Sequence, residues 1–219
     1  MEFGPLVLSF ELATIATIIA AVFGIAIAGV LANRAFPGRD LLEVLFTAPI
    51  VMPPTVLGYY LLYTLGRSSV IGRGFEAITG SSIVFTKLGA LVAATVVALP
   101  YVVKNARASL ESTDRTLVLA ARTLGAPPLR AFFTVQLPLA TRGIAAALML
   151  AFARAIGDFG VTLLVAGNIP GRTRTAPIAI YDAILGMREA DAAGMVAVLT
   201  GLVIGLLYAV AKLTRERVR

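Results

Sequence analysis

The sequence contains neither cysteine nor histidine, and only 14% of its 219 residues are charged. It therefore lacks the thiolate and imidazole ligands of most zinc, haem and iron–sulfur sites, and the side chain that most often acts as a general base near neutral pH. Redox and metal chemistry are not expected, and we predict no catalytic residue, no metal site and no cofactor.

Long apolar runs dominate the rest of the composition. Hydrophobic residues make up 58% of the chain and the mean hydropathy is +0.90, outside the usual range of soluble domains. Only helices and closed barrels satisfy every backbone group within hydrocarbon, and the runs have the length of membrane-spanning helices. We predict an all-α integral membrane protein that forms a single domain over residues 1–219.

The expected membrane spans lie at about 9–32, 43–66, 84–103, 140–166 and 192–212. The second contains Pro49, Pro53 and Pro54, which remove backbone donors, so this helix should bend, either as a permanent kink or as a moving hinge. The loop after it is expected to carry a short helix around 75–79. Residues 176–185 are apolar but short, and are re-entrant, interfacial or an additional span.

The Lys and Arg residues are distributed unevenly around these spans. Five spans place the termini on opposite sides of the membrane, and cytoplasmic loops carry an excess of basic residues. Most of the nineteen Lys and Arg residues lie inside if the carboxyl terminus is cytoplasmic. We therefore predict a multi-pass protein of the cytoplasmic (inner) membrane with its amino terminus outside. Topology then explains the net charge of +7 without nucleic-acid binding.

The longest polar interval, 104–139, falls on the predicted cytoplasmic side. Asp114 is placed to cap a helix that ends near Gly125, where a left-handed residue is expected. Pro127 and Pro128 then precede a second short helix, because proline is tolerated in the first helical turn. The pattern predicts a helix–turn–helix hairpin, which is either a plain connector or a docking element.

The spacing within this hairpin resembles a family motif. Ala120 and Ala121 are followed after three residues by Gly125, and after nine more by residues 135–138. This is similar to the E-A-A-x3-G-x9-I-x-L-P loop of ATP-binding-cassette importer permeases, except that the leading acidic residue is absent. The resemblance implies a coupling helix that docks on an ATPase subunit. The residues it implicates are Ala120, Ala121, Arg122, Gly125, Ala126, Leu137 and Pro138.

The resemblance extends over almost the whole chain, since 120–126, 151–160 and 167–175 look like the molybdate permease family. It implies the MetI-like fold of type I importer permeases, a permease homodimer, two cytoplasmic ATPase subunits and an external (periplasmic or extracellular) oxyanion-binding protein. The substrate implied is molybdate, with tungstate or sulfate as alternatives. The chain has no G-x-x-x-x-G-K-[ST] phosphate loop, so ATP hydrolysis is expected on the partner and not here.

Arg154 and Asp158 are the charged residues within 143–165, and their spacing places them on one helix face. Because an isolated charge in hydrocarbon is costly, the two should pair. The pair is either a structural contact or part of a gate or anion path. Gly157 and Gly160 flank Asp158 and permit close helix approach or a local break.

Asn168, Arg172 and Arg174 lie in the loop after the fourth span, which is predicted to be outside. There they contact an acidic surface of the binding protein, attract anions, or are simply solvated.

Two other protein classes compete with the importer interpretation. A self-sufficient ion-coupled carrier usually shows inverted repeats and intramembrane acids, and only Asp158 approaches that description. An intramembrane enzyme needs a nucleophile–base pair or metal ligands within the spans, which the absence of His and Cys disfavours.

Overall fold

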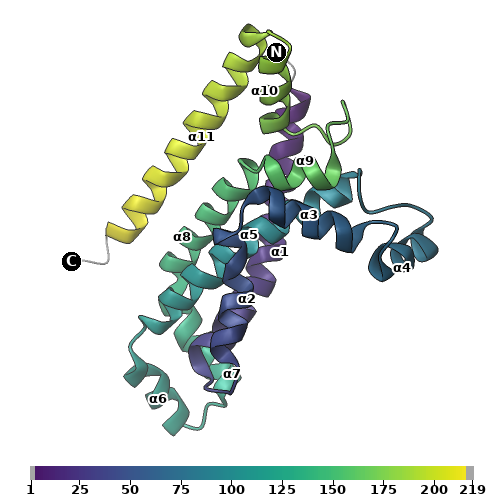
Figure 1. Ribbon diagram of the computed structural model, residues 1–219. Coiled ribbons are helices and arrows are strands. Elements are labelled where there is room, and N and C mark those ends of the chain that lie inside the picture. Colours follow the sequence, from purple (N-terminus) through teal and green to yellow (C-terminus); the bar gives the residue numbers. More distant parts are fainter. Residues whose placement is uncertain (1–2, 216–219) are drawn as a thin grey trace.

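The computed structural model describes residues 3–215, and every regular element in that range is a helix (Figure 1). The longer helices are α1 (Gly4–Asn33), α5 (Lys87–Glu111), α8 (Leu137–Ile156) and α11 (Glu189–Arg215). The shorter ones are α2 (Arg39–Val51), α3 (Pro54–Leu65), α4 (Val70–Thr79), α6 (Arg115–Thr123), α7 (Pro128–Ala131), α9 (Gly160–Ala166) and α10 (Ala176–Leu185). A π-helical segment, η1 (Phe132–Gln136), joins α7 to α8.

Four helices in the described part of the chain are long and apolar enough to cross a membrane, and a fifth span is obtained if α2 and α3 count together. The four are α1, α5, α11 and the continuous helix Pro128–Ile156. The prediction of an all-α membrane protein with about five spans is confirmed. Several helices extend beyond the apolar runs, because helical hydrogen bonding continues past the hydrocarbon into the interface.

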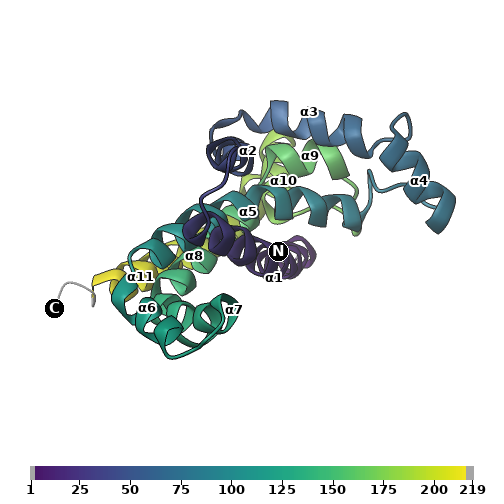
Figure 2. The ribbon, with the colours of Figure 1, turned by 90° about the horizontal axis from the view of Figure 1, so that it is seen from below.

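The bundle core consists largely of alanine. Helices α1, α5 and α8 contribute Ala16, Ala98 and Ala151, all fully buried, to one apolar cluster. Small residues let helix backbones approach closely. At Gly24 of α1, an added Cβ would lie only 2.8 Å from Cγ1 of Val102 on α5. Helix α5 contacts α1, α2, α8 and α9, and is therefore the centre of the fold (Figure 2).

The second span is more sharply interrupted than the single bent helix expected over 43–66. Helix α2 ends at Val51, Met52 and Pro53 are extended, and α3 begins at Pro54 after a bend of 115°. Residues before proline disfavour the helical conformation, so the Pro53–Pro54 pair stops the helix altogether. Pro49, by contrast, lies inside α2 without ending it.

The expected fourth span over 140–166 is not one helix, which corrects the sequence interpretation. Helix α8 ends at Ile156, and α9 begins at Gly160 and turns aside to lie along α3 (Figures 1 and 2). Glycine favours the break because it is a poor helix former. The carboxylate of Asp158 stabilises the new start, since it accepts the backbone N–H of Thr162.

The polar interval 104–139, expected to contain a helix–turn–helix hairpin, also contains the end of α5 and the helix that runs into α8. Helix α5 continues to Glu111, and Pro128 begins a helix that runs without interruption into α8. Charged residues do not end a helix, and an i,i+4 ion pair between Arg107 and Glu111 supports the last turns of α5. The hairpin therefore consists of α6, α7 and η1.

The ends of the long helices fall into two groups (Figure 1). The start of α1 lies near α10, and the hairpin lies at the opposite end of the bundle, toward which α11 also runs. The short helix expected around 75–79 is α4, and the apolar segment 176–185 is α10. Helix α11 leans away from the bundle, and of its residues Ala192 and Met195 are buried.

Candidate functional site

The hairpin is closed by caps at both ends of α6. Asp114 accepts hydrogen bonds from the Thr116 hydroxyl at 2.6 Å and from the Thr116 backbone N–H at 2.9 Å. The bond from the Thr116 hydroxyl, and to a lesser extent the bond from its backbone N–H, hold the pKa of Asp114 below its ordinary value. Gly125 adopts φ +88°, and Ala126 N–H donates to the carbonyl of Ala121 in a Schellman arrangement.

The exposed surface of the hairpin is apolar and basic. Leu124 is 89% exposed and Leu129 is 70% exposed, although both belong to a segment expected outside the membrane. Arg122 and Arg130 are exposed beside them. Large exposed apolar side chains rimmed by charge are typical of a protein contact, so the hairpin has the surface of a docking element.

The base of the hairpin is fixed to the bundle on two sides. The buried side chain of Gln136 donates Nε2–H to the carbonyl of Leu110 at 3.2 Å, at the end of α5. The ring of Phe132 lies over Gly29 of α1, where an added Cβ would be 3.1 Å from Cε2. The base of the hairpin therefore contacts both α1 and α5.

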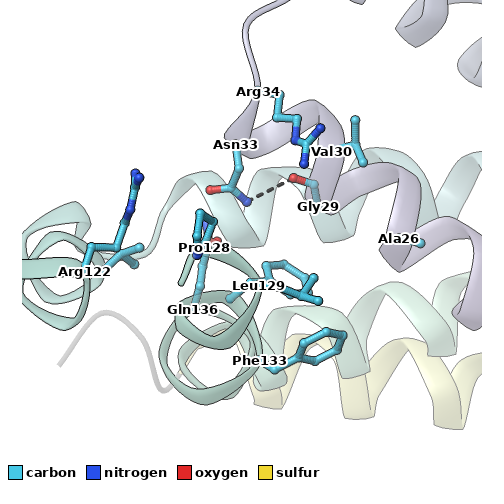
Figure 3. Close-up of a pocket in the computed structure, with 12 residues that line it drawn as sticks. Ala26, Gly29, Val30, Asn33, Arg34, Arg122, Pro128, Leu129, Phe133 and Gln136 are labelled. Carbon is cyan, nitrogen blue, oxygen red and sulfur yellow. Dashed lines mark hydrogen bonds between the residues drawn. The ribbon is translucent and has the colours of Figure 1, made fainter. Parts of the chain in front are cut away.

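A cavity of about 370 Å³ separates the end of α1 from the hairpin (Figure 3). Gly29 and Val30 form part of one wall, and Leu129 and Phe133 form part of the other. Arg34 and Arg122 also line it, from opposite sides. Of the predicted coupling residues, Arg122 thus borders the cavity, while Leu137 and Pro138 lie in the first turn of α8.

The predicted intramembrane ion pair is present. Arg154 Nη1 lies 3.2 Å from Asp158 Oδ1, and Asp158 Oδ2 accepts from the backbone N–H and the hydroxyl of Thr162 at 2.9 and 2.8 Å. The Asp158 side chain is 1% exposed and that of Arg154 is 30% exposed. A buried carboxylate needs such partners to remain charged, so the pair and the start of α9 depend on each other.

Glycines bring the two interrupted spans into contact. A Cβ on Gly160 would lie 2.8 Å from Cβ of Pro54, and one on Gly58 would lie 2.8 Å from Cδ1 of Leu164. Gly157 ends α8, at the other side of the break. The starts of α3 and α9 therefore touch. Non-helical backbone at membrane depth is tolerated where protein or water covers it.

The three candidate residues in the loop after α9 have different environments. Arg174 Nε donates to Asn168 Oδ1 at 2.7 Å, and Asn168 Nδ2 donates to Asp182 Oδ1 at 3.1 Å. Asp182, on α10, also pairs with Arg188 at 3.0 Å. Asn168 and Arg174 thus belong to one network around Asp182, whereas Arg172 is exposed. Sequence reasoning missed Asp182, because its partner Asn168 is 14 residues away and nothing local links them.

A second ion network was also missed. Arg39 of α2 lies 3.0 Å from Glu111 of α5, and Arg107 contacts both Glu111 and Glu43. These contacts join the start of α2 to the end of α5, next to the hairpin. The 72-residue separation of Arg39 and Glu111 hides the contact from any local pattern. Within residues 3–215, no cluster of His, Cys, Asp and Glu is suited to hold a metal ion.

Comparison with known proteins places these features in a family. Residues 13–217 match the family model described as "Binding-protein-dependent transport system inner membrane component". The molybdenum transport system permease protein ModB of Escherichia coli (strain K12) is 42% identical over 183 residues, covering 84% of this chain and 80% of that protein. ModB of Azotobacter vinelandii is 37% identical over 204 residues, covering 92% and 90%.

Solved structures agree in fold. The inward-facing MetNI methionine ABC transporter superposes with a TM-score of 0.72 at 16% identity, covering 97% of this chain and 94% of that chain. A bacterial ABC transporter involved in alginate import gives a TM-score of 0.66 at 15% identity, covering 95% and 79%. The overall helical arrangement is therefore shared with both.

Proposed function

This chain belongs to the family of binding-protein-dependent transport system inner membrane components, and from that premise we propose that it is the membrane subunit of an ATP-driven molybdate importer. The assignment of molybdate as the substrate rests on the 37–42% identity to ModB proteins over 80% or more of both chains. Tungstate and sulfate are the alternative substrates, since selectivity in such systems lies largely in the external binding protein.

The hairpin supports coupling to a separate ATPase. Its exposed leucines and arginines suit a groove on a soluble partner, and Gln136 and Phe132 connect it to the bundle. Ala120, Ala121, Gly125 and Ala126 keep the tip narrow through small side chains and the left-handed turn. Movement of the ATPase would then be passed to α1 and α5.

A homodimer is the assembly that the apolar surface supports. No residue within Arg39–Val51 of α2 is buried, and α11 has only two buried positions. One chain forms a thin wall around an anion, whereas a two-fold dimer encloses a path between its copies. The contact of α3 with α9 would face that path, because its helix breaks need protein or water beside them.

The Arg154–Asp158 pair is proposed as part of the gate region together with Gly157 and Gly160. It lies where α8 stops and α9 begins, so any change in that angle alters the pair. Arg154 is partly exposed and cationic, which suits a surface that an oxyanion passes. In the outer loop, Arg172 is exposed and would contact the binding protein, while Arg174 donates a hydrogen bond to Asn168.

Uptake into sealed vesicles tests the proposal. The chain is reconstituted with its partner ATPase and its binding protein, and molybdate accumulation is measured with and without ATP. Accumulation that requires both ATP and the ATPase is expected, with tungstate and sulfate as competitors. Uptake driven by an ion gradient alone would overturn the importer, and preference for sulfate would overturn the substrate but leave the importer intact.

A further inference from the structure

A small cavity lies where five helices meet beside the helix break. Its volume is about 10 Å³, and its walls come from α1, α5, the end of α8, the break with α9, and the residue before α10. The polar groups in the walls are those of Ser9, Asp158, Thr162 and Thr175. The other lining residues are Leu12, Ala90, Ala94, Ala155 and Ile156. Space of this size matches one water molecule.

Thr175 occupies the N-cap position of α10 but does not cap it. The backbone N–H of Ala176 instead donates to Ser9 Oγ of α1 at 2.8 Å. Thr175 is 5% exposed, and no group in the described range 3–215 forms a hydrogen bond with its hydroxyl. A buried hydroxyl without a partner is destabilising, and this residue lines the cavity, where a partner would fit.

The opposite wall offers hydrogen-bonding capacity. Asp158 Oδ1 accepts from Arg154 and retains a further lone pair, since each carboxylate oxygen accepts about two bonds. The Ser9 hydroxyl accepts from Ala176 and still carries its own proton. A water here has the two to four polar partners that internal waters require. A cation is disfavoured, because the guanidinium of Arg154 already balances the single acid of the cavity.

We propose that this cavity binds one internal water molecule, which accepts a hydrogen bond from the Thr175 hydroxyl and donates one to the Asp158 carboxylate. Ser9 supplies a further partner from α1. The water joins the start of α10 to the break between α8 and α9. Without it, Ser9 contacts only the start of α10, and Asp158 contacts only the residues on either side of the break. The position of α10 then follows the position of the break. This inference is independent of the substrate and of the ATPase.

The bound water is tested by whether removing the Thr175 hydroxyl lowers or raises the unfolding midpoint. Thr175→Val keeps the shape of the side chain and removes the hydroxyl. With a bound water, the unfolding midpoint of the purified transporter complex should fall by about 2–4 °C, because Asp158 and Ser9 lose a bridged partner. If the hydroxyl is simply unpaired, valine relieves an unsatisfied group and the midpoint stays the same or rises, which overturns the proposal.

A matched control and a direct observation accompany this test. Thr95→Val removes a hydroxyl that is satisfied within α5 by the carbonyl of Leu91, and should change the midpoint less than Thr175→Val. If Thr175→Val fails to assemble, the wild-type complex is used instead, and a density map that resolves ordered waters shows whether the site is occupied. A peak within hydrogen-bonding distance of Thr175 Oγ1 and Asp158 supports the proposal, and a map without it refutes the site.

Discussion

At the scale of single residues, Asp158 performs two tasks with one carboxylate. One oxygen pairs with Arg154 on α8, and the other caps α9 through Thr162. The residue therefore compensates a charge within the membrane and defines where the second helix starts. The i,i+4 spacing predicted the pair with Arg154 but not the bond to Thr162 at the start of α9.

Removing the charge of Asp158 separates its structural and transport roles. Asp158→Asn leaves Arg154 without its counter-charge, and breaking a buried pair in this way costs at most about 3–5 kcal/mol, less here because Arg154 is partly exposed. We expect reduced assembly, measured as the yield of folded protein. The double variant Arg154→Gln/Asp158→Asn should recover assembly. If it also transports at the wild-type rate, the pair is structural and the gate role is excluded.

Asp114 controls the start of α6 outside the spans. Because the folded pKa is lowered relative to the unfolded one, its stabilisation is present above the ordinary carboxyl pKa and is lost as pH falls through the lowered value. Asp114→Ala should speed amide exchange in α6 at neutral pH, whereas Asp114→Asn, also a good cap, should not. Equal exchange in all three proteins, measured by mass spectrometry, would contradict the cap assignment.

At the scale of helices, the interruptions have different chemical causes. The α2–α3 break follows from two consecutive prolines, whereas the α8–α9 break needs a glycine and an aspartate that caps the next helix. The η1 segment is a third irregularity: the Leu137 N–H reaches back to Phe132, which accommodates one extra residue in the helix that joins hairpin and bundle.

Deleting Thr134 tests whether this π segment sets the hairpin's orientation. Loss of one residue lets an α turn replace the π turn, which leaves the flanking helices nearly aligned but changes the spacing between Phe132 and Gln136, so the two side chains no longer reach Gly29 and Leu110 together. We expect ATP hydrolysis in the complex to persist while molybdate uptake falls at least tenfold. Thr134→Ala, which keeps the register, should transport normally. Unchanged uptake by the deletion variant would show that the register is unimportant.

At the scale of the whole molecule, the two ends of the bundle carry different elements. The basic hairpin lies at one end of the bundle, and α1 begins at the other (Figure 1). The networks around Asp182 and Glu111 lie near these two opposite ends and fix short helices to long ones. The expected amino-terminus-out orientation follows if the hairpin meets a cytoplasmic ATPase.

Single introduced cysteines test the orientation directly, because the natural chain has none. Arg172→Cys, in the loop after α9, should react with a membrane-impermeant maleimide in intact cells. Arg130→Cys, in the hairpin, should react only after lysis. The reverse pattern would invert the topology, and labelling of both in intact cells would place the hairpin outside.

Local chemistry explains the features that were predicted correctly. The spans follow from hydropathy, because hydrocarbon forces the backbone to satisfy itself within helices. The limits of α6 follow from Asp114 and Gly125, and the Arg154–Asp158 pair follows from the helical repeat. In each case the partners lie within a few residues, so the sequence by itself determines the outcome.

The tertiary structure decided everything that depends on how helices approach one another. The contact of Gly160 with Pro54, the bond of Gln136 to Leu110, and the bond of Ala176 to Ser9 join residues from distant parts of the chain. The turn of α9 away from α8 is of the same kind, since a glycine permits a break but packing against α3 selects its direction. Sequence determined which segments enter the membrane and where the prolines interrupt the second of them, and packing against α3 determined the direction of α9 after α8 ends.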